Sequence, residues 1–292
     1  MMTPKLLPPG KDVRCEPLTC TRPLAALPVA NHPLGETILE RIADLAGVGL
    51  AQRVDCWLSP ASLQALAAEP EAVLVLDNEV VAWVSPDGEP PTRPKRLVAD
   101  AGCFRIRFPW DLLRVNEELV GGLTENAIAG ELSDKATVEG VLVLGQGSRI
   151  LPGVYIEGNA VIGRNCKIGP NCYLRGSTAI GDNCHVGQAV EIKNAILLPR
   201  VAIGHLSYCG DSIIGEGTNF GAGTITANFR HDGANHRSMV DGKLLDTGRR
   251  KFGAILGDDV HTGIHTSFYP GRKMWPHTST RPGEVVQRDI LA

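Results

Sequence analysis

The sequence predicts a mainly β fold, in which a β-helix of short strands follows a small α/β domain. The leading observation is an aliphatic residue at every sixth position: Val138, Leu144, Ile150, Ile156, Ile162, Ile168, Leu174, Ile180, Val186, Ile192 and Leu198. A period of six fits neither one helix nor one amphipathic strand. It is typical of a parallel β-helix, in which each thin coil buries its face against the next coil. The composition agrees, because 5% of the residues are aromatic and 33 are glycines.

The first domain is expected to cover residues 1–112, where the six-residue repeat is absent. An apolar stripe through Ile38 and Ile42 predicts a helix that starts near Pro33 and ends before Gly47. Further along this domain, the alternation of apolar segments with turn residues suggests a few strands and one more helix.

A helical connector is expected over residues 113–135, where apolar positions recur at helical spacing until a glycine pair interrupts them. The β-helix is then expected over residues 136–292, with about seven coils of 18 residues. The repeat is lost at residues 229–252, a stretch too long for a tight turn. We therefore expect a hairpin or loop that leaves the β-helix at this point.

Charge and cysteine usage exclude several classes of protein. A net charge of −3 gives no sign of a nucleic-acid or membrane partner. The first 14 residues lack a long apolar run, so we expect no signal peptide or spanning helix and a cytoplasmic location. Cys166, Cys172 and Cys184 fall at the small inward position of their strands, where free cysteine behaves as a small buried hydrophobe. Without a CxxC pair, neither a disulfide framework nor a cysteine metal site is predicted.

Polar residues that a β-helix does not need are concentrated between residues 175 and 228. Arg175 and Lys193 are 18 positions apart, so they should stack on one edge of successive coils, about 5 Å apart. Two cations at that spacing would suit a phosphate group. The other interpretation is a solvated edge on which Glu191 lies between two basic side chains. The spacing alone favours this second interpretation.

Three segments make the choice more specific: EIKNA at 191–195, HLSYCGDSIIGEGTNFGAGTITANF at 205–229 and TGRRKFGAILGDDVHTGIHTSFYPG at 247–271. They resemble the acetyltransferase domain of the bacterial bifunctional UDP-N-acetylglucosamine pyrophosphorylase/glucosamine-1-phosphate acetyltransferase. They are also similar to archaeal sugar-1-phosphate nucleotidyltransferases with an amino-sugar acetyltransferase C-terminus. The resemblance implies a left-handed β-helix, a homotrimer, and acetyl transfer from acetyl-CoA to a hexosamine-1-phosphate in UDP-N-acetylglucosamine biosynthesis. It implies no metal requirement for that transfer.

The resemblance also implies a role for individual residues of this chain. Those roles are His205 as general base, Glu191 to orient the attacking amine, Arg175 and Lys193 to bind the sugar phosphate, Tyr208 and Asn219 to position the sugar, and Asn228 with Phe229 near the acetyl donor. One feature departs from the family pattern, because the phosphate-binding lysine falls on Ala234 or His236. Arg237 is then the substitute cation.

The N-terminal part resembles the start of a sugar-1-phosphate nucleotidyltransferase through the PLT, TRP and LPV elements between residues 17 and 29. In that family a glycine-rich loop cradles a triphosphate with backbone amides. Here Pro9 and Asp12 occupy glycine positions, and Leu24 replaces a lysine. The domain is also about half the usual size. We expect a truncated remnant without pyrophosphorylase activity.

Two alternatives belong to other functional classes. The chain could retain sugar-1-phosphate nucleotidyltransferase activity, or it could be a non-catalytic sugar-nucleotide-binding protein. A zinc enzyme of the β-helix class would need three convergent histidines. His231 and His236 have a suggestive spacing, but Ala195 stands two coils earlier where a third ligand would be required. No metal site is predicted.

Overall fold

The computed structural model describes residues 4–43, 45, 49–85 and 88–292. The chain divides into two compact units. The first contains residues 1–15, 23–27 and 32–111, and the second contains residues 16–22, 28–31 and 112–292. Two short N-terminal segments therefore group with the β-helix, which the sequence did not predict. The described part of the chain has no helix long and apolar enough to cross a membrane.

The first unit is built on a five-stranded sheet in the order β1-β4-β7-β6-β8. These strands are β1 Lys5–Leu7, β4 Leu50–Arg53, β7 Glu79–Val84, β6 Ala72–Leu76 and β8 Lys95–Val98. The β1–β4 and β6–β8 pairs are parallel, whereas β7 is antiparallel to both neighbours. Strands β5 (Cys56–Trp57) and β9 (Phe104–Arg105) form a separate antiparallel pair.

Two helices accompany this sheet. Helix α1 spans Leu34–Ala43, which confirms the predicted helix, although its expected end at Gly47 lies outside the described residues. Helix α2 spans Pro60–Ala67, and the hydroxyl of Ser59 caps it by accepting a hydrogen bond from the Ser62 amide. The remaining short elements are η1 Leu18–Cys20, η2 Leu24–Ala26, β2 Pro28–Val29 and β3 His32–Pro33.

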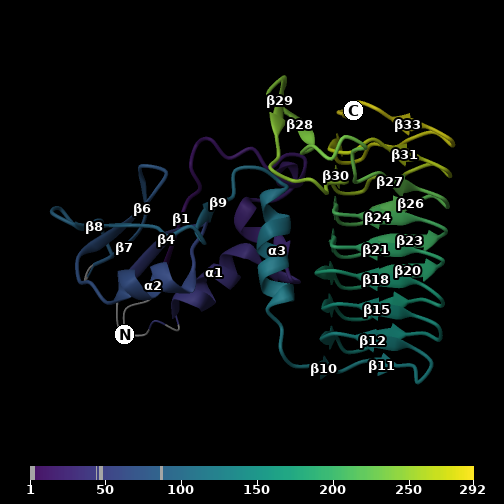
Figure 1. The fold of residues 1–292 in the computed structure, drawn as a ribbon, viewed down its shortest axis with the longest axis horizontal. Helices are drawn as coiled ribbons and strands as arrows, with labels where there is room; N and C mark the ends of the chain where they lie inside the picture. Colours follow the sequence, from purple (N-terminus) through teal and green to yellow (C-terminus); the bar gives the residue numbers. More distant parts are fainter. Residues whose placement is uncertain (1–3, 44, 46–48, 86–87) are drawn as a thin grey trace. The chain divides into compact units, whose positions relative to one another are not determined.

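The second unit is a parallel β-solenoid with three faces, one sheet to each (Figure 1). The first face contains β10 Ala127–Ile128, β13 Leu142–Leu144, β16 Ala160–Ile162, β19 Thr178–Ile180, β22 Ile196–Leu197, β25 Ile213–Ile214, β30 Ala254–Leu256 and β32 Arg272–Met274. The second face contains β11 Glu131–Leu132, β14 Arg149–Ile150, β17 Lys167–Ile168, β20 His185–Gln188, β23 Ala202–His205 and β26 Asn219–Phe220. The third face contains β12 Thr137–Glu139, β15 Tyr155–Glu157, β18 Tyr173–Arg175, β21 Glu191–Lys193, β24 Tyr208–Gly210, β27 Ile225–Thr226, β31 Ser267–Phe268 and β33 Val285–Val286.

The predicted aliphatic repeat forms the core of this solenoid. Ile156, Ile168 and Ile180 are each no more than 1% exposed, one on each face. Cys166 and Cys184 are free thiols buried in the same core. Each buried aliphatic side chain contributes about 1.5–3 kcal/mol by removal from water. The mainly β fold with a C-terminal β-helix is therefore confirmed.

Two details of the structure differ from the prediction. The solenoid begins at β10, earlier than the expected start near Ala136, because the first coil carries exposed apolar residues, Ile128 and Leu132, instead of a buried repeat. It has about nine turns instead of seven, since a bridge from Met274 to Ile290 adds a level above β32. The phase slips before Leu198, because Ile180 pairs with Leu197. Coils in this region pair at an offset of 17 residues, as Ala202 with Asn219, instead of 18.

A helix and a hairpin complete the second unit. Helix α3 spans Asp111–Gly121, and its Val120 is buried with Val161 and Ala179 of the first face. The hairpin joins β28 (Arg237–Val240) to β29 (Lys243–Asp246) in antiparallel pairing. It interrupts the coils after β27, as predicted from the loss of the repeat, and it projects from the solenoid in Figure 1.

Candidate active site

A cluster of polar side chains occupies the third face, where β18, β21 and β24 lie side by side. The Cα partner of Arg175 is Lys193, which confirms the predicted stacking of these two cations. The Cα partner of Glu191 is Tyr208 on the next coil. The strands rise about 3.3 Å per residue, so Lys193 lies about 7 Å along its strand from Glu191. The cluster therefore spans both ends of the third-face strands.

Arg175 and Glu191 form an ion pair across neighbouring coils. The Arg175 Nη2 and Nε atoms lie 2.6 Å and 2.7 Å from Glu191 Oε1. Both side chains are about one-third exposed, at 34% and 31%. Solvent therefore screens the pair, and its contribution to stability is small. Only one oxygen of Glu191 contacts the guanidinium, so some of the five N–H donors of Arg175 do not bond Glu191. Those donors can bind a phosphate.

Asp211 is the centre of the second group of contacts. It is 2% exposed, and its Oδ2 accepts hydrogen bonds from Lys193 Nζ at 2.8 Å and Asn228 Nδ2 at 2.5 Å. Its Oδ1 accepts one from Asn194 Nδ2 at 3.0 Å. A buried carboxylate needs such donors, because an unpaired buried charge is strongly destabilising. Asp211 thereby fixes the positions of the Lys193 ammonium and the Asn228 amide.

Tyr208 lies against this group on the same face. Asn228 Nδ2 donates a hydrogen bond to the phenol oxygen at 2.8 Å. Burial, with Asp211 and Glu191 nearby, raises the pKa of Tyr208 to about 12, so the phenol stays neutral at physiological pH. Gly210 provides the space for this pair, because a Cβ there would lie 2.3 Å from the phenol oxygen and 2.8 Å from Asn228 Nδ2.

His205 and Asn219 stand on the neighbouring second face. His205 is the last residue of β23, and Tyr208 is the first residue of β24, so they flank one corner of the solenoid. The His205 side chain is exposed, and its carbonyl accepts a hydrogen bond from Ser207 Oγ at 2.7 Å. Asn219 is also exposed, one coil above Ala202. The structure therefore brings Arg175, Glu191, Lys193, Tyr208 and Asn228 into one cluster and leaves these two residues at or beyond its corner.

The remaining predicted residues belong to the segment around the hairpin. The ammonium of Lys251 lies 3.8 Å from the ring centroid of Phe229, which is 46% exposed. Ala234 is exposed, whereas His236 is buried and its Nε2 lies 2.9 Å from the Asn228 carbonyl oxygen. Arg237 is exposed on β28.

Three residues that organise the cluster were given no role by the prediction from sequence. Glu117 of α3 accepts a hydrogen bond from Asn194 Nδ2 at 2.7 Å and pairs with the Arg249 guanidinium of the hairpin segment. Glu117 is 77 positions from Asn194 and 132 positions from Arg249, so no local sequence pattern could reveal these contacts. Asp211, by contrast, belongs to the polar stretch noted in the sequence, but the sequence does not indicate that Lys193, Asn194 and Asn228 donate to it.

The histidines with suggestive spacing do not gather into a metal centre in the part of the chain that the structure describes. No group of three or more His, Cys, Asp or Glu residues is arranged there for a metal ion. His236 faces a backbone carbonyl, and His277 lies 3.6 Å from Asp259 as a two-residue contact.

Known proteins are similar in sequence to this chain. The family described as the GMPPB C-terminal domain matches residues 151–279. A bifunctional sugar-1-phosphate nucleotidylyltransferase/acetyltransferase of Sulfurisphaera tokodaii is 39% identical over 198 residues, which cover 68% of this chain and 49% of the relative. The bifunctional protein GlmU of Methanococcus maripaludis strain C7 is 46% identical over 185 residues, covering 63% of this chain and 44% of the relative. The resemblance predicted from the sequence is confirmed.

The chain spans about half the length of the curated relatives it matches. Solved structures are more distant. A UDP-N-acetylglucosamine acyltransferase of Francisella novicida is 15% identical, with a TM-score of 0.22 over 57% of this chain and 63% of that one. The fold assignment therefore rests on the strand register of the solenoid itself.

Proposed function

We propose that the solenoid catalyses transfer of an acetyl group from acetyl-CoA to the amine of a hexosamine-1-phosphate, in nucleotide-sugar biosynthesis. The observation that carries the proposal is the register of Arg175 with Lys193, next to Tyr208 and Asn228 on one face. These groups combine the cations that a sugar phosphate requires with neutral donors and acceptors that suit sugar hydroxyls. The similarity to bifunctional acetyltransferases supports the same reaction.

His205 is the proposed general base. An amino sugar is largely ammonium at neutral pH, and only its neutral amine attacks a thioester. Histidine titrates near that pH and suits proton removal. The amine nitrogen bonds to the acetyl carbon, the carbon–sulfur bond breaks, and the CoA thiolate leaves and takes up a proton. Because the thioester is already activated, holding amine and thioester together supplies much of the rate. No step of this scheme calls for a metal ion.

The proposed acceptor site places Glu191 and Tyr208 close to His205, since all three flank the corner between the second and third faces. Arg175 and Lys193 would hold the phosphate on the same face, with the Arg175 guanidinium next to Glu191. Asn219 of the second face would contact the sugar, and Asn228, next to Phe229, would lie towards the acetyl donor. Asp211 is added to this set as the residue that positions Lys193 and Asn228.

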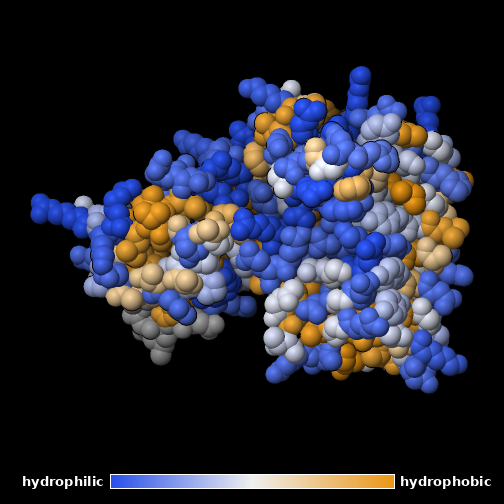
Figure 2. Space-filling model, viewed as in Figure 1, coloured by the Kyte–Doolittle hydropathy of each residue, from blue (hydrophilic) through white to orange (hydrophobic). Residues whose placement is uncertain are grey.

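A homotrimer is part of the proposal. Large apolar side chains remain exposed on the solenoid, among them Leu206 at 65% and Ile264 at 50%, and hydrophobic patches are visible among its hydrophilic surface in Figure 2. Both residues lie beside the corner that carries His205. Burial of this edge against a second copy would remove it from water and would place a neighbouring chain beside His205.

The N-terminal segment supports the expectation that nucleotidyl transfer is lost. Thr21 and Arg22 both contact Asp258 of the solenoid, and Arg22 Nη2 also lies 2.8 Å from Glu216 Oε2. The arginine of the TRP element therefore forms ion pairs that attach this segment to the solenoid. We therefore propose that the PLT and TRP elements serve to attach the N-terminal segment to the solenoid and do not bind nucleotide.

A thiol-release assay tests the proposed function. The full chain is incubated with acetyl-CoA and with glucosamine-1-phosphate or galactosamine-1-phosphate, and free CoA is followed with a thiol reagent. We expect release that depends on the amino sugar phosphate, and much weaker release with the N-acetylated sugar phosphate, which has no free amine. Binding of sugar nucleotide without thiol release from any amino sugar phosphate would favour the non-catalytic alternative.

A further inference from the structure

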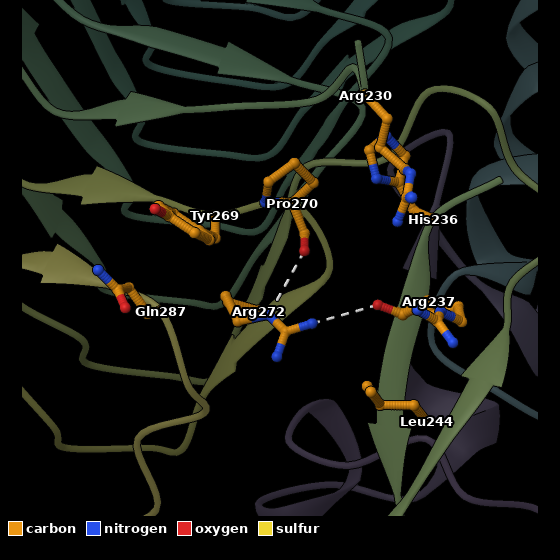
Figure 3. A pocket seen from close by; sticks show the side chains of 8 residues that line it. All are labelled: Arg230, His236, Arg237, Leu244, Tyr269, Pro270, Arg272 and Gln287. Atoms are coloured by element: carbon orange, nitrogen blue, oxygen red, sulfur yellow. Dashed lines mark hydrogen bonds between the residues drawn. The ribbon is translucent and has the colours of Figure 1, made fainter. Parts of the chain in front are cut away.

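The hairpin and the last coils of the solenoid border a cavity of about 250 Å³, and Arg237, the expected substitute cation for the sugar phosphate, is one of its lining residues. Its walls come from the hairpin segment, from the stretch that joins β31 to β32, and from the residue after β33. The lining residues drawn in Figure 3 are Arg230, His236, Arg237, Leu244, Tyr269, Pro270, Arg272 and Gln287. We refer to this cavity as the arginine pocket.

The arginine pocket carries an excess of positive charge. Arg272 is held by backbone carbonyls, because its Nη2 lies 3.2 Å from the Arg237 oxygen and its Nε lies 3.4 Å from the Pro270 oxygen. Arg230 pairs with the exposed Asp232 at 2.5 Å. In the part of the chain that the structure describes, this is the one ion pair between a carboxylate and any of the three lining arginines. Guanidinium groups with free donors are the preferred partners of phosphates.

The walls of the pocket also offer flat and apolar surface. Tyr269 is 52% exposed and Leu244 is 47% exposed, and Figure 3 shows their side chains on opposite sides of Arg272. Gln287 stands next to Tyr269 in the same view. An aromatic face beside arginines suits a base that is joined to phosphates, because every base can stack on a ring.

The pocket is connected to the acceptor cluster through one residue. The His236 ring lines the pocket and lies 2.9 Å from the Asn228 carbonyl oxygen, while the Asn228 side chain bonds Tyr208 and Asp211. Along the solenoid, Phe268 pairs with Thr226 on the coil above that of Tyr208. With strands about 4.8 Å apart, Tyr269 lies about 10 Å above Tyr208 along the axis. One elongated ligand would reach both places.

We propose that the arginine pocket binds the nucleotide end of the acetyl donor, with the phosphates on Arg237 and Arg272 and the adenine against Tyr269. Coenzyme A carries its thioester and its phosphates at opposite ends of one flexible molecule. The thioester would then reach the acceptor cluster past Asn228. This inference rests on the proposed function for the identity of the donor, but its charge and shape arguments come from the pocket alone.

Binding of CoA to the full chain by titration calorimetry tests this assignment. Arg237→Ala should weaken CoA by about tenfold, since a charge-assisted hydrogen bond is lost. Tyr269→Ala should also weaken it, and adenosine 3′,5′-bisphosphate should respond to both substitutions in the same way. Lys243→Ala removes one positive charge from the same hairpin outside the pocket and should leave CoA affinity unchanged.

The possible outcomes separate this inference from the proposed function. If the wild-type chain transfers acetyl groups but Arg237→Ala and Tyr269→Ala keep the wild-type affinity for CoA, the pocket assignment is wrong and the transferase stands. If CoA binds through these residues but no acetyl group is transferred, the pocket stands and the transferase fails. Displacement of CoA from the pocket by UDP-N-acetylglucosamine at equal concentration would overturn the donor assignment in favour of a sugar nucleotide.

Discussion

At the scale of single residues, Asp211 decides whether the acceptor cluster is held together. It is buried, and Lys193, Asn194 and Asn228 all donate to it. In the Asp211→Asn variant the charge that Lys193 faces is lost, and one amide oxygen must replace two carboxylate oxygens. We expect the free energy of unfolding to fall by about 2 kcal/mol, since hydrogen bonds to charged groups contribute about 1.5–3 kcal/mol.

Urea denaturation measures this loss, and Asp232→Asn is its matched control. Asp232 also pairs with an arginine, but the pair lies on the surface, where ion pairs contribute little. The control should keep nearly the stability of the wild type. Equal stability of both variants would show that Asp211 does not organise the cluster.

A second prediction at this scale concerns His236. Burial lowers its pKa below the ordinary 6.5, and the nearby Arg230 guanidinium acts in the same direction, although the Asn228 carbonyl opposes it. The unfolded state therefore binds the proton more readily. The stability contributed by neutral His236 is fully present above the unfolded pKa and is lost as the pH falls through the lower folded pKa.

Thermal melting at about pH 7.5 and about pH 5 checks this sign. His236→Gln keeps a donor for the Asn228 carbonyl but cannot be protonated, so its melting temperature should fall less on acidification than that of the wild type. His231→Gln changes an exposed histidine five positions away and should behave as the wild type. An identical acid response of the His236 variant would contradict the prediction.

At the scale of secondary structure, α3 fastens the hairpin segment to the solenoid. Glu117 bonds both Asn194 of a coil corner and Arg249 beside the hairpin. In Glu117→Gln, the charge that holds Arg249 is removed while the side chain keeps its size. We expect faster amide hydrogen exchange in residues 228–252, because local opening becomes easier when a fastening contact is lost.

Glu118→Gln provides the control for the helix. Glu118 pairs with Arg114 one turn away at 3.7 Å, and both side chains are 45% exposed. Such i,i+4 pairs contribute only a few tenths of a kcal/mol. Hydrogen exchange in residues 228–252 should therefore match the wild type in this variant. Protection that is unaffected by Glu117→Gln would mean that the hairpin is held by its other contacts alone.

At the scale of the whole molecule, the proposed trimer would bury the edge beside His205. Leu206 is 65% exposed and directly follows the proposed base. Leu206→Asp places a charge on that edge and should shift a trimer towards monomer, because burial of an unpaired carboxylate is costly. Light scattering coupled to size exclusion measures the mass. Lys167→Asp, an exposed change on the second face two coils below β23, should keep the mass of the wild type. A wild type that elutes as a monomer would refute the trimer.

How far the sequence predicted this molecule depends on how local each signal is. The repeat from Val138 to Ile192 predicted which side chains point inward, because these coils differ from one another only by translation. It was wrong at its last member, since Leu197 and not Leu198 takes the next core position. The stacking of Arg175 on Lys193 followed from the same period. The sequence also shows a shift in the phase of the repeat, which returns at Tyr208, Ile214 and Phe220. The offset of 17 residues between neighbouring coils, as from Ala202 to Asn219, accounts for that shift.

Long-range contacts were beyond any pattern in the sequence. The pair of Glu117 with Arg249 and the pair of Arg22 with Asp258 each join segments that are more than 100 positions apart. The arginine pocket was likewise hidden, because Arg230, Arg237 and Arg272 meet only when the hairpin folds back on the last coils. The individual residues were visible in the sequence, but their proximity was not.

The rate of thiol release in His205 and His185 variants tests the central claim most directly. His185 lies on the same solenoid face, one coil below Ala202, so His185→Gln is a matched control. We predict that His205→Gln lowers the rate constant by about 10²–10⁴-fold, the usual contribution of a general base, while His185→Gln keeps the wild-type rate. Wild-type release of CoA that persists in His205→Gln would contradict the assignment of the base.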